Sequence, residues 1–352
     1  MQIKRIALGG IIMTVIMFSG CSTTVHNLAI VEEKTLETGK TEQESVTEKD
    51  INMNEKESFN AESNINDVIH DSAFDNYGRL IFPVDMEIED NLKLKDVSSI
   101  LPWYSEVNND KTVEIVNYMK NQAMNGEQIF YPIYSEEEMQ ADADKKDTGL
   151  FFFRGNAGAK TTIINAGGGF VYVAGIHDSF PHALELSKKG YNAFALIYRP
   201  GAQTACEDLA RAIAFFHENA EKLQIDMTDY SLWGGSAGAR MAAWLGSYGT
   251  AYFGEKEYPA PAAVIMQYTG LSQVTGMEPP TYACVGTSDG IASYRSMENY
   301  ISQIQQNGPN TKIEVFKGLS HGFGLGEGTV AEGWIDRAIS FWEDNMNALD
   351  KR

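Results

Sequence analysis

From about residue 128 onward, short apolar, β-branched runs alternate with longer stretches whose apolar positions recur every three or four residues. The short runs, typical of strands, lie at residues 129–133, 150–154, 161–166, 193–198, 230–234, 262–268, 281–286 and 312–317. The longer stretches, typical of helices, lie at residues 178–189, 205–222, 237–247, 292–306 and 330–349. This alternation predicts an α/β fold: one mostly parallel sheet of about eight strands with helices on both faces. The first two runs are close enough for an antiparallel start.

The first residues have the pattern of a secretory signal. Lys4 and Arg5 precede an apolar stretch at residues 6–18, which is shorter than the ~20 residues that span a bilayer. Residues 18–21 read Phe-Ser-Gly-Cys and resemble a bacterial lipobox, although leucine is usual where Phe18 stands. The resemblance implies that Cys21 is lipidated and holds the protein on the outer surface of a membrane. The alternative is an ordinary cleaved signal with a chance cysteine.

The segment between this signal and the alternating region divides in two. Residues 22–75 are rich in Glu, Thr, Asn, Ser and Lys, and predict a disordered polar tether because they bury little apolar surface. Residues 76–127 predict a helical extension, with two short helices between residues 91 and 125, the second at residues 111–124. This extension either pads the edge of the sheet or caps the functional site. Residues 128–352, which carry the alternating pattern, are predicted to form one domain.

Composition narrows the classes of function. Apolar residues make up 43% of the 352 residues, which is enough for a large core, and the formal net charge of −20 argues against a nucleic-acid partner. Beside Cys21 the chain has only Cys206 and Cys284, for which two buried free thiols are commoner than a disulfide. No spacing of Cys, His or carboxylates indicates a metal site, and we expect no cofactor.

The first candidate for chemistry is a serine at a strand–helix junction. Residues 233–238 read Trp-Gly-Gly-Ser-Ala-Gly and contain Gly-x-Ser-x-Gly. The pattern alone is weak, but here a predicted strand precedes it and a predicted helix follows. That is the tight turn that exposes a nucleophilic hydroxyl above a sheet. Ser236 is therefore the predicted nucleophile.

A glycine run follows the strand at residues 161–166. Gly167, Gly168 and Gly169 lack the lysine of a Walker loop and the spacing of a dinucleotide-binding loop. The run does match an oxyanion loop, whose backbone N–H groups approach a substrate oxygen. We predict Gly168 and Gly169 as donors together with the N–H of Ala237, and Gly167 is the alternative by one register.

An acid and a histidine follow the last two predicted strands. Asp289 lies in the turn after residues 281–286, and His321 lies in the loop after residues 312–317. The chain order Ser, Asp, His is that of one of the three major triad arrangements. His321 is the predicted general base, and Asp289 is predicted to orient it. An aspartate in such a turn is also common for capping alone.

These motifs together support a family resemblance. From about residue 161 to its C-terminus the chain resembles the acetyl-esterase and lipase branch of the α/β hydrolases, whose members carry a His-Gly-Gly-Gly loop before the triad. Residues 167–169, Ser236, Asp289 and His321 match in order, but Ala166 stands where the loop histidine is usual. The missing histidine raises the question of how the loop is braced. The resemblance implies a serine carboxylesterase for short acyl esters, with acetylated carbohydrates outside the cell as candidates.

Three further residues are candidates for the substrate pocket. Phe170 follows the glycine run directly, and His177 lies at the entry of the next helix. Arg199 follows the fourth predicted strand at the edge of the sheet where such folds bind ligands. A helix-entry role for His177 and a simple turn at Arg199 are the structural alternatives.

Two other functions remain open at this stage. One is a peptidase of the same fold, which uses the same triad chemistry, although no repeats typical of a propeller precede the domain. The other is a catalytically silent surface lipoprotein that binds a ligand. Otherwise we expect a small acyl ester or acylated sugar as the partner, and contact with the membrane only through the N-terminal lipid.

Overall fold

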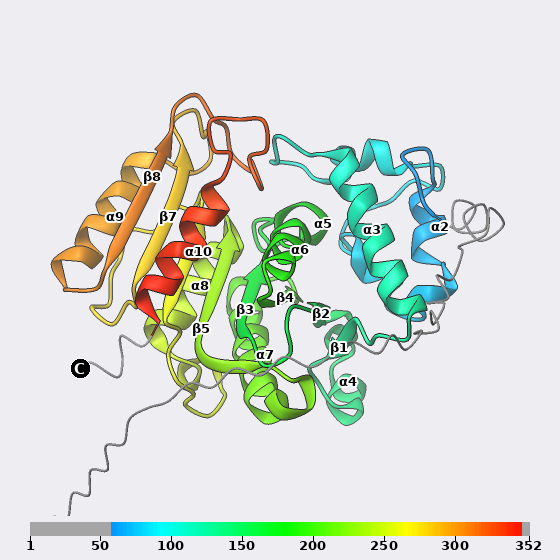
Figure 1. Ribbon diagram of the computed structural model, residues 1–352, viewed down its shortest axis with the longest axis horizontal. Helices are drawn as coiled ribbons and strands as arrows, with labels where there is room; N and C mark the ends of the chain where they lie inside the picture. The colour runs from blue at the N-terminus through cyan, green and yellow to red at the C-terminus, as the bar shows by residue number, and fades with distance from the viewer. Residues whose placement is uncertain (1–57, 347–352) are drawn as a thin grey trace, which may run out of the picture. The chain divides into compact units, whose positions relative to one another are not determined.

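The computed structural model describes residues 58–346, all of which belong to one compact unit (Figure 1). The predicted signal, Cys21 and the tether up to residue 57 lie outside the described residues. Within residues 58–346, no helix is both long enough and apolar enough to cross a membrane. Cys206 and Cys284 are both buried free thiols.

An eight-stranded sheet forms the centre of the fold. Its strands are β1 (Phe130–Pro132), β2 (Gly149–Phe153), β3 (Lys160–Asn165), β4 (Asn192–Ile197), β5 (Asp226–Gly235), β6 (Ala263–Gln267), β7 (Thr281–Gly286) and β8 (Thr311–Phe316). They are ordered β1-β2-β4-β3-β5-β6-β7-β8. β2 pairs antiparallel with both neighbours, and every other pairing is parallel. The predicted mostly parallel sheet with an antiparallel start is confirmed.

Strand β5 begins four residues earlier than predicted. Asp226 pairs with Lys160 of β3, and the register between these strands shifts before Thr162. The Lys160 ammonium lies 2.9 Å from the Asp226 carboxylate. The Lys160–Asp226 ion pair therefore lies in a part of β5 that the apolar pattern did not predict.

Helices cover both faces of the sheet. Those of the catalytic region are α5 (Gly175–Asp178), α6 (Phe180–Lys188), α7 (Ala202–Leu223), α8 (Ala237–Tyr248), α9 (Tyr294–Gln306) and α10 (Trp334–Asn345). Helices α7 and α8 pack against each other. On the opposite face, α6 meets α10 where the rings of His182 and Trp334 lie 5.6 Å apart. Figure 1 shows α10, in red, crossing in front of the sheet.

Two helix boundaries differ from the pattern for local reasons. The helix predicted at residues 178–189 is observed as α6, and the short helix α5 before it was not predicted. Ser179 separates the two helices with a non-helical φ of −138° and a ψ of −44°. Pro181 then occupies the first turn of α6, where its missing N–H is tolerated. Helix α10 starts later than predicted because Gly333 adopts a φ of 74° immediately before it.

The N-terminal extension packs into the same core as the sheet. It contains α2 (Ile65–Ile69), three 3-10 segments (Ser72–Phe74, Gly78–Ile81 and Leu94–Ile100) and α3 (Asn109–Met124), shown in blue and cyan in Figure 1. α4 (Glu136–Ala141) and a further 3-10 turn (Ala143–Asp147) lie between β1 and β2. The Tyr118 ring of α3 stacks on Phe153 of β2 with centroids 5.7 Å apart. One part of the extension therefore pads the antiparallel edge of the sheet.

The predicted tether extends too far along the chain. Residues 58–75 fold into α2 and the first 3-10 turn, and the side chains of Ile65, Val68 and Phe74 are fully buried. The apolar residues here are few and widely spaced, but each of them inserts into the core. Asn64 caps α2 by accepting a hydrogen bond from the Asn66 N–H. The folded part of the chain therefore begins before residue 75.

Candidate active site

Ser236 lies at the sharp turn between β5 and α8. Its φ of 51° and ψ of −115° are unfavourable for a residue with a side chain, and such a backbone costs about 1–3 kcal/mol. The turn also requires glycine at position 238, since a Cβ there would lie 1.9 Å from the Asn165 carbonyl oxygen. The strained turn lifts the Ser236 hydroxyl out of the sheet, as the Gly-x-Ser-x-Gly pattern predicts.

The structure brings Ser236, His321 and Asp289 together. His321 Nε2 lies 3.1 Å from Ser236 Oγ, and His321 Nδ1 lies 2.8 Å from Asp289 Oδ2. The other carboxylate oxygen, Asp289 Oδ1, accepts the N–H groups of Ile291 and Ala292 at 2.8 and 2.7 Å. Both oxygens of the fully buried Asp289 side chain are therefore engaged, which orients the carboxylate toward the imidazole.

Among the described residues, three with free backbone N–H groups line the cavities that contain Ser236. Those of Gly168, Gly169 and Ala237 donate to no acceptor within residues 58–346, whereas the Gly167 N–H donates to Asp178 Oδ2 at 2.6 Å. The engaged Gly167 N–H favours the register in which Gly168 and Gly169 are the donors. Gly168 needs to be glycine, because its φ is 123° and a Cβ would lie 2.0 Å from the Tyr172 carbonyl oxygen.

Asp178, at the end of α5, braces the glycine loop and was not identified from the sequence. Beside the Gly167 N–H, its carboxylate accepts the hydroxyl of Tyr104 at 3.0 Å and the hydroxyl of Tyr268. Tyr198 adds a second support by donating its hydroxyl to the Ala166 carbonyl at 2.6 Å. These contacts hold the loop at the position where Ala166 stands instead of the histidine of the resembled branch. The only sequence signal was an acid within an otherwise apolar stretch.

Burial sets the ionisation of the two neighbouring α5 residues. Burial raises the pKa of Asp178 to about 6, although its hydrogen bonds to Tyr268, Gly167 and Tyr104 oppose that rise. Burial lowers the pKa of His177 to about 4, so its imidazole is neutral at pH 7. The Asp178 carboxylate serves the loop as a hydrogen-bond acceptor, because the Gly167 N–H and the hydroxyls of Tyr104 and Tyr268 all donate to it.

A second part of the N-terminal extension lies directly at the site. Ser105 donates its N–H and its hydroxyl to the His321 carbonyl at 3.2 and 2.7 Å. Tyr104 reaches Asp178, and the Pro102 carbonyl accepts the Tyr172 hydroxyl at 2.5 Å. The extension therefore both pads the sheet and caps the site, so the two placements left open by the sequence occur together.

Two cavities open from Ser236. The first, of about 180 Å³, is lined by Gly169, Phe170, Ser236, Ala237, Arg240, Tyr268, Thr269, Gly270, Ile291 and Ala292. The second, of about 320 Å³, is lined by Trp103, Tyr104, Gly168, Gly169, Ser236, Ile291 and His321. Phe170 lies in the first cavity as predicted for a pocket residue, with its ring stacked on Trp244 at 6.1 Å.

His177 does not face either of these cavities, contrary to the pocket role considered for it. Its Nε2 lies 3.0 Å from the Gly322 carbonyl, and its ring meets the edge of Tyr104 at 5.2 Å. The imidazole is buried behind the loop that carries His321. His177 therefore supports that loop from within α5, a role different from both the pocket role and the helix-entry role considered from the sequence.

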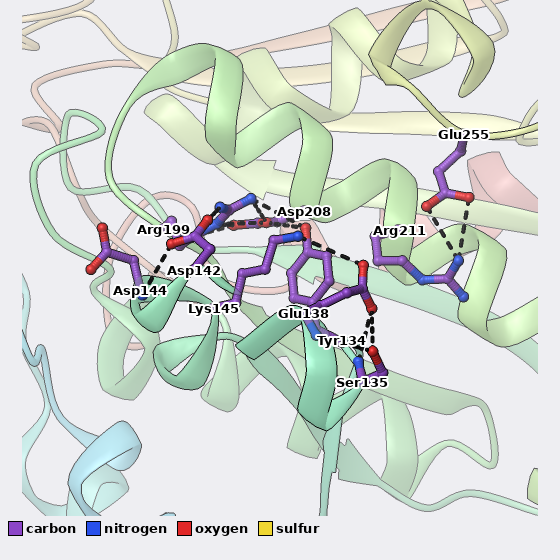
Figure 2. Close-up of polar contacts among 10 residues, drawn as sticks. All are labelled: Tyr134, Ser135, Glu138, Asp142, Asp144, Lys145, Arg199, Asp208, Arg211 and Glu255. Carbon is purple, nitrogen blue, oxygen red and sulfur yellow. Dashed lines mark hydrogen bonds and ion pairs between the residues drawn. The ribbon is translucent and has the colours of Figure 1, made fainter. Parts of the chain in front are cut away.

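Arg199 is also not a pocket residue. Its guanidinium donates to the buried Asp208 carboxylate, with Nη2 at 2.7 Å from Oδ1, and to Asp142 at 2.8 Å. Figure 2 shows this group held between Asp208 and Asp142 beside Tyr134, whose hydroxyl also donates to Asp208. An arginine that follows a buried strand can bind a ligand, but it can equally well bind a carboxylate within the protein. Asp208 on the following α7 was that partner.

Comparisons with known proteins agree with this architecture. Residues 154–281 match the family model described as BD-FAE, a stretch that includes Ser236 and the glycine loop but not Asp289 or His321. No curated protein matches this chain. An acetyl ester-xyloside bifunctional hydrolase from Caldicellulosiruptor lactoaceticus superposes with a TM-score of 0.54 at 19% identity, covering 61% of this chain and 95% of that one.

A native esterase 2 from Thermogutta terrifontis superposes with a TM-score of 0.50 at 20% identity, covering 56% of this chain and 88% of the esterase. At such low identity these likenesses establish the fold. The chain has the α/β-hydrolase fold, with an eight-stranded, mostly parallel sheet and helices on both sides.

Replacing Asp178 with asparagine should lower the kcat of ester hydrolysis about 100-fold, with a much smaller change in KM. An asparagine would keep its one oxygen on the Gly167 N–H and turn its NH₂ toward the Tyr268 hydroxyl, which must then reverse and accept. The neutral amide oxygen also accepts more weakly than the carboxylate, so we expect the Gly167–Gly169 loop to shift. A displacement of about 1 Å in such a loop costs on the order of 10²-fold in rate. Steady-state kinetics on p-nitrophenyl butyrate measure this effect.

The matched control for this variant is Asp110→Asn, which changes an exposed aspartate on α3. It should leave both kinetic constants unchanged. An Asp178→Asn enzyme with normal kcat and a native circular-dichroism spectrum would show that the carboxylate does not position the loop.

Proposed function

We propose that this protein is a serine carboxylesterase that hydrolyses short-chain acyl esters, acetyl esters among them, through an acyl-enzyme. The observation that carries the proposal is the hydrogen-bonded chain from Ser236 Oγ through His321 to Asp289, at 3.1 and 2.8 Å. It lies beside three backbone N–H groups without acceptors among the described residues. An α/β-hydrolase fold presents this arrangement at the carboxyl ends of its strands.

The geometry supports a two-step reaction. His321 Nε2 takes the proton from Ser236 Oγ as the oxygen attacks the ester carbonyl carbon. The negative charge that develops on the carbonyl oxygen is stabilised by the N–H groups of Gly168, Gly169 and Ala237. His321 then returns the proton to the departing alcohol, which leaves an acyl group on Ser236. In the second step water attacks this acyl group. His321 takes the proton from the water and returns it to Ser236 Oγ, which releases the acid.

An exposed aromatic side chain supports a carbohydrate on the alcohol side. The Trp103 side chain lies in the same cavity as His321 and is 51% exposed, with its ring 5.7 Å from Tyr172. A flat, partly wet aromatic face next to the proton donor suits the apolar face of a sugar ring. The structural neighbour from Caldicellulosiruptor lactoaceticus is itself named an acetyl ester-xyloside hydrolase. An acylated sugar is therefore our candidate substrate class.

The test compares chain lengths and bond types on one enzyme. Residues 58–352 should hydrolyse p-nitrophenyl acetate and butyrate much faster than the octanoate, because the charged Arg240 in the wall of the smaller cavity beside Ser236 disfavours a long apolar chain. Matched p-nitroanilides of the same acids should be cleaved far more slowly. Faster cleavage of the anilides would favour a peptidase. A folded enzyme inert toward every ester would favour a binding lipoprotein.

We also propose that the protein is held at the outer surface of a membrane by a lipid on Cys21. The proposal is supported by the basic Lys4 and Arg5, the apolar residues 6–18 and the small residues before the cysteine. Metabolic labelling with an alkyne fatty acid tests it. Label that persists in a Cys21→Ser variant would contradict it.

A further inference from the structure

Arg240 is a charged residue in the wall of the site that the proposed chemistry does not use. It lies on the first turn of α8, one turn after the nucleophile, and lines the cavity that contains Ser236 and Phe170. Its Nη2 donates to the Gly270 carbonyl at 2.9 Å. No other hydrogen bond or ion pair involves its guanidinium within residues 58–346.

Unpaired arginine is unusual in this chain, whose formal net charge is −20. Arg79, Arg154, Arg199, Arg211 and Arg337 each contact a carboxylate. Among the described arginines, only Arg240 and Arg295 do not, and Arg295 is exposed on α9. Neither cavity that opens from Ser236 is lined by an acidic residue. The donors of Arg240 that do not reach Gly270 are therefore available to a ligand.

The position of His321 decides which part of the substrate approaches Arg240. His321 lines the cavity with Trp103 and Tyr104, but it does not line the cavity with Arg240. Since His321 gives its proton to the leaving alcohol, the alcohol lies in the Trp103 cavity. The acyl group then extends into the smaller cavity, where Arg240 and the Gly270 carbonyl form part of the wall.

We propose that Arg240 binds a carboxylate at the far end of the acyl chain, so that the preferred substrates are half-esters of short dicarboxylic acids such as succinate. The inference rests on the proposed esterase activity and specifies its acyl group. Arginine presents a planar set of donors that matches a carboxylate. Hydrolysis of such an ester by water yields the alcohol and the free dicarboxylate.

The test measures ethanol release from ethyl hydrogen succinate and from the uncharged ethyl pentanoate. Ethyl esters are chosen because an activated aryl half-ester of succinate would be cleaved by its own carboxylate. We expect wild type to prefer the succinate, and Arg240→Gln to lower the ratio of the two kcat/KM values about 10-fold to 100-fold, which is the effect of one hydrogen-bonded charged group. Arg240→Lys should retain part of the preference, and added salt should reduce it.

The matched control is Arg295→Gln, which should leave the ratio unchanged. Equal kcat/KM values for the two esters, or a ratio that Arg240→Gln does not change, would overturn the proposal while leaving the esterase activity intact. A preference for acetoxyacetate, whose carboxylate lies in the alcohol, that is lost in Arg240→Gln would overturn the assignment of the cavities. Failure of wild type on every ester would refute the proposed function itself.

Discussion

Replacing Ser236 with alanine should reduce ester hydrolysis by about 10⁴-fold to 10⁶-fold, the loss typical of removing the nucleophile of a triad. The change deletes only the Oγ atom, which lies 3.1 Å from His321 Nε2. No covalent intermediate can then form, and the residual rate comes from binding and the oxyanion N–H groups alone. The measurement is kcat for p-nitrophenyl butyrate at saturating substrate.

The control for this variant is Ser302→Ala, which removes an exposed hydroxyl from α9. Both variants should unfold near the wild-type temperature, because Ser236 Oγ makes no contact that holds the core. Alanine is also no more strained than serine at the positive φ of position 236. Substantial turnover by a folded Ser236→Ala enzyme would place the nucleophile elsewhere.

Replacing Asp289 with asparagine should lower kcat by about 10⁴-fold, because the amide imposes the wrong tautomer on His321. Asp289 Oδ1 accepts two backbone N–H groups, from Ile291 and Ala292. An asparagine keeps its oxygen on those donors, so its NH₂ faces His321 Nδ1. That nitrogen must then accept, which places the proton on Nε2 and leaves no base for the Ser236 hydroxyl.

The same variant offers a further readout in its pH profile. With the wrong tautomer favoured at neutral pH, activity should recover partly in alkaline solution, where hydroxide removes the serine proton. The exposed Asp336→Asn on α10 is the matched control and should behave as wild type. A fully active Asp289→Asn enzyme would show that the carboxylate serves only the turn.

The arrangement of the sheet could be predicted from local pattern because the central parallel strands β3, β4, β6 and β7 are almost continuously buried. The strand at residues 281–286 was predicted with the observed ends, and its apolar residues are fully buried. Ser236, Asp289 and His321 were identified because each lies in the turn or loop that follows a strand, and the carboxyl ends of parallel strands meet at one edge. A site built at strand ends is therefore visible in sequence once the strands are.

The contacts between distant segments were not predictable in this way. Asp178 and Tyr104 are separated by 74 residues, and neither lies in a recognisable motif. Arg199 was a pocket candidate because it follows a strand at the functional edge, but its guanidinium instead binds the buried Asp208 carboxylate. The local sequence pattern does not show which charged side chains will pair with each other inside the fold.

Folded segments with few apolar residues are also difficult to predict from the sequence pattern. Residues 58–75 look like a polar tether, yet Ile65 and Val68 lie on one face of α2 and insert into the core. Two apolar side chains three residues apart are too few to establish a helical period. Such a segment can be told from a disordered one only when the structure of the core into which its apolar side chains pack is known.

The central claim, that Ser236 is an activated nucleophile, is tested most directly by mass spectrometry after treatment with a fluorophosphonate. The account predicts the addition of one phosphonyl group per chain, located on the peptide that contains Ser236 and absent from Ser236→Ala. It further predicts slower labelling of Asp289→Asn. A folded wild-type protein that gains no mass, or that is labelled at another residue, would contradict the account.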